Sequence, residues 1–103
     1  MEINQKIPDW LWACLRIAFL GEIYTNIRAI AISYDNKIIG LRYYLDREVL
    51  DYDYESLEVV STNLDSIIPI SLEGLDIECF FTEELIKDVN PLDGFFYVRR
   101  EYN

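Results

Sequence analysis

The chain has 103 residues, of which 51% are hydrophobic and 15% are aromatic. This length suits one domain with one core, taken here as residues 1–103, and this composition excludes intrinsic disorder. A formal net charge of -10 makes direct binding to nucleic acid or to an anionic membrane unfavourable, and the lack of histidine removes the commonest general base near neutral pH.

The segment from Ile7 to Glu22 is expected to form the first helix. Pro8 suits a first helical turn, Asp9 favours the positive end of the helix dipole, and Gly21 is expected to end the helix. The apolar residues that recur at helical spacing are Trp10, Leu11, Cys14, Leu15, Ile17 and Ala18. A helix that is apolar nearly all round is either deeply covered or partly exposed to another chain.

Localisation is predicted from the same end of the chain. The apolar run WLWACL is far shorter than the roughly 20 residues that a membrane span needs. The leader MEINQK is not followed by the small-residue cleavage pattern of a signal peptide. We therefore expect a soluble, cytoplasmic protein.

Residues 26–46 predict a β-hairpin, because two runs rich in β-branched and aromatic residues flank Asp35-Asn36. With these two residues as the turn, Ile32 is expected opposite Ile39, and Ile30 opposite Leu41. That register places four large apolar side chains on one face. The small residues Ala29, Ala31 and Gly40 then lie on the other face, where they leave room for a helix.

Residues 46–60, DREVLDYDYESLEVV, contain six carboxylates and a single base, Arg47. The imbalance continues along the chain, since residues 46–93 contain fourteen acidic and two basic side chains. Three explanations are open: a cation site, a solvated face, or a surface shaped for a basic partner.

From Asp51 onward the periodicity favours an amphipathic helix that Pro69 ends, with Leu57, Val60 and Leu64 on its apolar side. Asp51 or Asp53 is expected to cap its start. A strand remains the alternative for this segment, because EVVST is rich in β-formers.

Residues 75–82 alternate apolar and polar side chains and predict a strand. Residues 83–94 predict a connection with turns at Asn90-Pro91 and Asp93-Gly94, and residues 95–102 predict a terminal strand. The order α-β-β-α-β-β indicates an α+β domain, a single small and mostly antiparallel sheet packed against helices.

The residue types argue against catalysis and against a dedicated metal site, so no catalytic residue, cofactor or metal ligand is assigned. DYDYE begins like a calcium loop, but Ser56 stands where that loop needs glycine and Thr62 where it needs a bidentate glutamate. Cys14 and Cys79 belong to no CxxC motif and have no histidine to pair with, so we expect two buried free thiols.

A surface for a basic partner explains the acidic stretch best. A solvated face usually mixes lysine with glutamate, and here bases are nearly missing. Carboxylates with tyrosines between them can imitate phosphates and stacked bases, which fits a nucleic-acid-binding protein and above all a nuclease. The predicted contact residues are Asp46, Glu48, Asp51, Tyr52, Asp53, Tyr54, Glu55, Glu58 and Asp65. Two alternatives stay open: Asp51 or Asp53 only caps the helix, and one tyrosine only fills the core.

Four segments in this order carry a family resemblance: FLGEIYTNIRAI, LRYYLDRE, SLEVVSTNLDSII and YVRRE. Together they resemble the small immunity proteins of bacterial toxin–immunity systems, including those of contact-dependent growth inhibition and colicin-like toxins. The resemblance implies a cytoplasmic, non-enzymatic protein that binds the C-terminal domain of a cognate toxin, often a nuclease, and it implies no catalytic residues.

A second hypothesis starts from the first helix. An apolar helix together with exposed Tyr43 and Tyr44 would suit a non-enzymatic structural adaptor, an obligate subunit or a homodimer. Such a protein would use a hydrophobic interface and keep its acidic surface for solubility.

Overall fold

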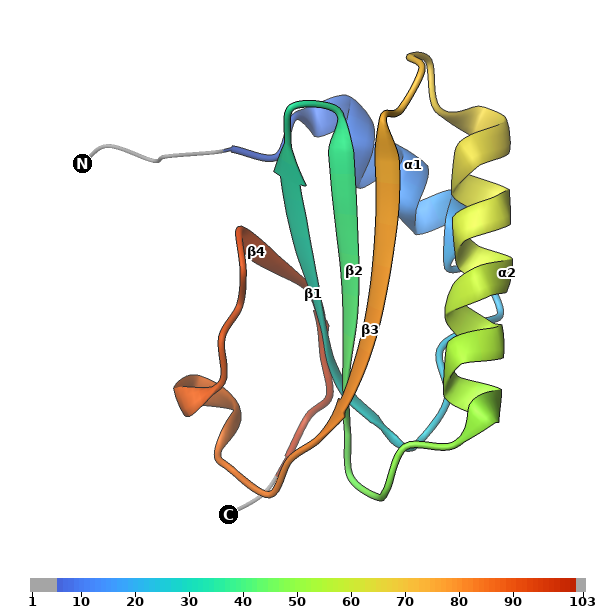
Figure 1. Ribbon diagram of the computed structural model, residues 1–103. Coiled ribbons are helices and arrows are strands. Elements are labelled where there is room, and N and C mark those ends of the chain that lie inside the picture. Colours follow the sequence, from blue (N-terminus) through green and yellow to red (C-terminus); the bar gives the residue numbers. More distant parts are fainter. Residues whose placement is uncertain (1–5, 102–103) are drawn as a thin grey trace, which may run out of the picture.

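The computed structural model describes residues 6–101 and confirms the predicted order of elements (Figure 1). The elements are α1 (Asp9–Ala18), β1 (Ile27–Asp35), β2 (Ile38–Leu45), α2 (Asp51–Ile67), β3 (Gly74–Phe81), the 3₁₀-helix η1 (Ile86–Asp88) and β4 (Gly94–Val98).

The four strands form one sheet in the order β3-β2-β1-β4. β1 pairs antiparallel with β2 and with β4, whereas β3 pairs parallel with β2, so the sheet is mostly antiparallel as predicted. The parallel pair follows from α2, which crosses over between β2 and β3 and brings the chain back in the same direction. Both helices lie against one face of the sheet (Figure 1), and the result is a single α+β domain.

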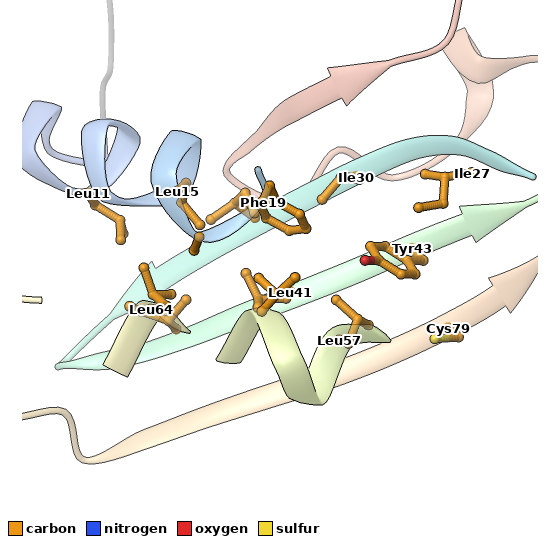
Figure 2. Packing of buried hydrophobic residues seen from close by; sticks show 14 of the residues in the cluster. Leu11, Leu15, Phe19, Ile27, Ile30, Leu41, Tyr43, Leu57, Leu64 and Cys79 are labelled. Atoms are coloured by element: carbon orange, nitrogen blue, oxygen red, sulfur yellow. The ribbon is translucent and has the colours of Figure 1, made fainter. Parts of the chain in front are cut away.

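The main core lies between the helices and the sheet. Leu11 and Leu15 of α1 and Leu57 and Leu64 of α2 are fully buried against side chains of β1 and β2 such as Tyr43, as Figure 2 shows. Each such side chain contributes about 1.5–3 kcal/mol by leaving water. This burial fixes α2 beside β3, and it therefore fixes the orientation of the outer face of α2.

The first helix is shorter than the sequence predicts. α1 ends at Ala18, and Gly21 follows with a φ of +77°, in the left-handed region that glycine adopts without strain. Its buried side chains are Leu11, Leu15 and Ala18, whereas Ile17 is 58% exposed. The helix is thus covered on one side only.

The predicted hairpin is confirmed, but its predicted register is wrong by two residues. Ile32 pairs with Leu41 and Ile30 with Tyr43, because the turn residues are Asn36 and Lys37, at φ 50° and 64°. A two-residue hairpin turn of this type needs positive φ at both central positions, and asparagine tolerates this conformation well. A shift of two residues keeps every side chain on its face, so the four predicted apolar side chains still share the core.

The small residues on the opposite face are covered differently from the prediction. Ala29 and Ala31 pack with Tyr44 and with Val89, which lies in the β3–β4 connection just after η1. Among residues 6–101, this connection rather than an α-helix covers that face of β1 and β2. The predicted turn near its end is present, since Gly94 N–H donates to Pro91 C=O at 3.0 Å.

The hairpin turn gives a prediction about stability. Replacing Lys37 by glycine is expected to raise the free energy of unfolding by about 0.5–1 kcal/mol, because a lysine at positive φ is strained. The matched variant Asn36→Gly should change stability by only a few tenths of a kcal/mol. Urea denaturation of both variants measures the difference, and an equal gain at both positions would contradict this account of the turn.

The second helix is confirmed, and the alternative of a strand is wrong for this segment. α2 runs from Asp51 to Ile67, and the chain is already extended at Ile68, the residue before Pro69. A residue before proline is disfavoured in helical conformation, which explains the end of α2. Leu57, Val60 and Leu64 are fully buried, as their spacing predicts.

Candidate interaction surface

The predicted contact residues lie in the loop after β2 and along α2, and the structure separates their carboxylates into three groups. One carboxylate is buried together with its ion pair, one lies in an ion pair at the surface, and the others are exposed. The three groups have different chemistry, so each is described in turn.

Asp53 is the buried carboxylate, with an exposed fraction of 0%. Arg47 donates to both of its oxygens at 2.8 and 3.0 Å, and the Leu50 N–H donates at 2.7 Å. The Tyr24 hydroxyl donates a further hydrogen bond. Burial would raise the pKa of Asp53, but the hydrogen bonds from Arg47, Tyr24 and Leu50 outweigh it and lower that pKa.

The prediction that Asp53 belongs to an exposed contact surface is therefore wrong. Its carboxylate caps the backbone at the start of α2 and ties the loop after β2 to Tyr24, which lies before β1. This is the capping alternative left open by the sequence, with an ion pair added. Asp51, the other candidate cap, is exposed.

Asp46 is the ion-paired carboxylate. Arg99 donates to it at 2.7 Å and Asn26 at 3.0 Å, and these two hydrogen bonds lower its pKa. Its side chain is still 31% accessible. Asp46 therefore lies at the surface with its charge partly balanced by Arg99, while Glu48 in the same loop is exposed.

The remaining predicted acids form what we call the acidic stripe, which consists of Asp51, Glu55, Glu58 and Asp65. Their spacing of three, four and seven residues places them along the side of α2 opposite its buried residues. All four are exposed, and α2 contains no lysine or arginine. The stripe extends roughly 21 Å along the helix axis, taking 1.5 Å per residue.

Tyr52 and Tyr54 flank the acidic stripe, with exposed fractions of 56% and 38%. Tyr52 packs edge-on against Tyr24 at a centroid distance of 5.1 Å, so one side of its ring is fixed and the rest is accessible. Neither tyrosine is buried in the core. A fixed aromatic ring beside carboxylates can contact a partner at low entropic cost.

Sequence reasoning left further acids of the same region out of the contact surface. Asp76 on β3 is exposed, and Glu83 and Glu84 are exposed just after this strand. β3 packs beside α2 (Figure 1), but Asp76 points to the face of the sheet away from the helices, so it adds negative charge at the sheet edge and not to the acidic stripe itself. Alternation in residues 75–82 places Asp76 on a polar face, but the strand order of the sheet is needed to show that β3 is at its edge.

The second hypothesis required exposed Tyr43 and Tyr44, and this prediction is wrong. Tyr43 is 0% and Tyr44 6% exposed, because α2 packs over the first and the connection through η1 covers the second. Exposed apolar side chains do occur at the end of α1, where Ile17 and Leu20 are 58% and 74% exposed and Leu20 shares a hollow with Phe96. That patch is the part of the second hypothesis that the structure supports.

The two cysteines differ in their burial. Burial raises the pKa of the Cys79 thiol to about 12, and burial also raises the pKa of Tyr43. Cys14 is a free thiol too, although it is only partly buried. Within residues 6–101 no three His, Cys, Asp or Glu side chains are grouped as metal ligands would be, and no helix is long and apolar enough to cross a membrane.

Comparison with known proteins identifies the family of this chain. No curated protein matches the sequence. The model of the MafI2 immunity protein family matches residues 8–101, which include every element described above. The chain therefore belongs to the MafI2 immunity protein family.

Proposed function

We propose that this chain neutralises its cognate toxin by covering a basic, nucleic-acid-binding surface of a nuclease domain with the acidic stripe of α2. The observation that carries the proposal is the stripe itself, four exposed carboxylates on one helix face without a single base in the helix. Neutralisation takes place in the cytoplasm, requires no cofactor, and involves no chemical step by the immunity protein.

Membership of the family gives the general function, which is neutralisation of a toxin. A MafI2 immunity protein neutralises a toxin and has that toxin as its partner. The proposal that the toxin is a nuclease rests on charge. A nuclease must hold a polyanion, and its substrate-binding surface is accordingly basic. Opposite charge on the inhibitor raises the association rate, to about 10⁸ per molar per second or more at low salt.

The composition of the stripe also supports binding rather than solubility alone. Concentrated like charge destabilises the compact state through self-repulsion, and lysines at helical spacing would relieve it. Among the described ion pairs, the only one that involves a carboxylate of α2 is that of Asp53, which is buried and takes no part in the surface. The exposed carboxylates remain unbalanced along the entire helix.

The test removes charge from the stripe without disturbing the fold. The double variant Glu55→Gln, Glu58→Gln is expected to lower the association rate with the toxin domain by about tenfold at low ionic strength. Asp53 must stay in place, because its loss would unfold the start of α2. Stopped-flow or surface-plasmon measurements between about 20 and 300 mM salt would show the difference shrinking as salt rises.

A matched control removes the same charge elsewhere. Asp9 and Asp35 are exposed and lie at the start of α1 and in the β1–β2 hairpin. The variant Asp9→Asn, Asp35→Asn should leave the association rate within about twofold of the wild type. Equal effects of the two double variants would mean that only net charge matters and that the acidic stripe is not the contact surface.

The second candidate is an adaptor that uses the apolar patch at the end of α1. Leu20 is 74% exposed there, and Phe19, Ile23 and Phe96 border the same hollow. Binding through this patch would hardly change with salt, whereas binding through the acidic stripe weakens as salt screens the charges. Binding that survives at high salt but is lost in Leu20→Ser would favour the adaptor.

A further inference from the structure

The outer edge of β3 is an open sheet edge. β3 is the terminal strand of the sheet, and it pairs on one side only, with β2 (Figure 1). Among the described residues, no hydrogen bond reaches the backbone of Leu75, Ile77 or Cys79 from the other side. Such an edge presents a row of unpaired N–H and C=O groups that can pair with another strand.

The ladder shows which groups point outward. Leu45 pairs with Phe81, and the next residue, Thr82, donates its N–H to Leu45 C=O at 3.1 Å. Residues of a strand alternate in the side to which their N–H and C=O groups point. The even-numbered residues of β3 therefore bond to β2, and Leu75, Ile77 and Cys79 direct their backbone groups outward.

The residues whose backbone groups point outward also anchor β3, because their side chains point into the core. Leu75, Ile77 and Cys79 pack their side chains against the main core under α2. The register with β2 is continuous over eight pairs and has no bulge. The edge is thus regularly paired with β2, and its side chains are fixed in the core, which makes it a ready template for a further strand.

Proteins usually protect such an edge with lysine, proline or a bulge, and β3 has none of the three. It carries Asp76 and Glu78 instead, and Glu83 and Glu84 follow it. Two copies of this edge would bring like charges face to face, which disfavours self-pairing. A strand with lysine or arginine side chains meets no such repulsion.

The acids lie on both sides of the open edge. Asp76 and Glu78 are on the face of β3 away from the helices, since Glu78 pairs with Arg42 there. On the helix side, a hollow is lined by Thr62 and Asp65 of α2 together with the start of β3. The two rows of side chains of an added strand would therefore face carboxylates on either face of the sheet.

We propose that a basic strand of the toxin domain pairs with the outer edge of β3 and extends the sheet to five strands. This proposal rests on the proposed function. The backbone hydrogen bonds supply the geometry of docking, and the carboxylates on both faces select a strand that carries positive charge. The acidic stripe then contacts the body of the toxin beside that strand.

Amide hydrogen exchange measured by NMR tests the pairing directly. The probe is the purified C-terminal domain of the toxin encoded beside this chain's gene, with the full immunity chain isotopically labelled. In the free chain, the amides of Asp76 and Glu78 should exchange slowly, because they bond to β2, and those of Leu75, Ile77 and Cys79 should exchange faster. In the complex, the amides of Leu75, Ile77 and Cys79 are expected to slow by at least about tenfold.

Two outcomes would overturn the proposal, and they differ in what they say about the proposed function. A complex confirmed by calorimetry in which these three amides exchange as in the free chain overturns strand addition alone. A wild-type chain that does not bind the toxin domain at all overturns the proposed function, and strand addition with it.

A charge change at the edge gives an independent readout. Asp76→Lys places on β3 the residue that natural edges use for protection, and it is expected to weaken toxin binding by at least about tenfold. Asp9→Lys makes the same change of charge at the start of α1, and its effect should stay within about threefold. Unfolding curves establish that both variants are folded, and toxin binding by Asp76→Lys at wild-type strength would overturn the proposal.

Discussion

Replacing Asp53 by alanine is expected to lower the free energy of unfolding by about 2–4 kcal/mol, because the buried Asp53 carboxylate is the shared acceptor of Arg47, Tyr24 and the Leu50 N–H. Arg47 loses the carboxylate to which two of its nitrogens donate, and Tyr24 and the Leu50 N–H lose their acceptor. The Asp53 side chain is 0% accessible, so water does not replace these partners unless the loop opens. Chemical denaturation at pH 7 measures the loss.

The control for this variant is the same substitution at Asp51, two residues earlier. Asp51 is exposed at the start of the same helix, so Asp51→Ala should cost only about 0.3–1 kcal/mol, the contribution of a carboxylate to the helix dipole. The two variants remove the same charge from the same turn. A similar loss for both would mean that Asp53 acts through helix capping alone and that its bonds to Arg47 and Tyr24 contribute little.

The contrast between these two acids shows what the sequence can predict here. Helical spacing places Leu57, Val60 and Leu64 on the buried side of α2, and the same spacing places Glu55, Glu58 and Asp65 in solvent. Asp53 follows the pattern as well, because it lies four and seven residues before Leu57 and Val60 and therefore on the buried side of α2. The spacing separates Asp53 from the exposed Asp51, but it does not identify the partner Tyr24, which is 29 residues away in the sequence.

The hairpin illustrates a second limit. The pattern of residues 26–46 shows two strands and their inner faces, because side chains alternate with a period of two. It does not choose between Asp35-Asn36 and Asn36-Lys37 as the turn, since both pairs contain an asparagine. The predicted register is consequently wrong by two residues, although the four apolar side chains that it assigns to the inner face are buried.

The position of β3 could have been predicted more fully. A helix between two neighbouring strands makes a crossover, and such strands pair in parallel. Residues 51–67 lie between β2 and β3, so the parallel pair follows from the order of elements once the two strands are neighbours. The open edge of β3 does not follow in this way, because it depends on β4 pairing with β1 and not with β3. The burial of Tyr44 could not be predicted in this way, because it depends on how the irregular connection around η1 covers the sheet.

The second large effect on stability is expected at Glu101, which follows β4 and binds Arg28 of β1. Arg28, 7% exposed, donates from two nitrogens to the two oxygens of Glu101 at 2.8 Å each, and Arg99 adds a bond at 2.9 Å. The bond from Arg28, and to a smaller extent that from Arg99, lowers the pKa of Glu101 to about 2. Glu101→Gln is expected to reduce the free energy of unfolding by about 3 kcal/mol at pH 7, which corresponds to this pKa difference at about 1.4 kcal/mol per unit.

The pH dependence separates this contribution from the general effect of charge. Because the pKa of Glu101 is lower in the folded state than in the unfolded state, its stabilisation is complete above an unfolded pKa of about 4.5 and is lost as the pH falls toward 2. The lowered pKa values of Asp46 and Asp53 act in the same direction. Protonation of the exposed acids acts in the opposite direction, since it relieves the repulsion of a chain with net charge -10.

The informative quantity is therefore the difference between wild type and Glu101→Gln at each pH, because the repulsion is nearly common to both. This difference should be about 3 kcal/mol from pH 7 to 5 and should shrink toward zero near pH 2. Glu83→Gln removes a charge from an exposed glutamate and should show no such trend. A difference independent of pH would mean that the introduced glutamine fails to fit the Arg28 site for steric reasons, and that the charge of Glu101 is not what holds the end of β4 to β1.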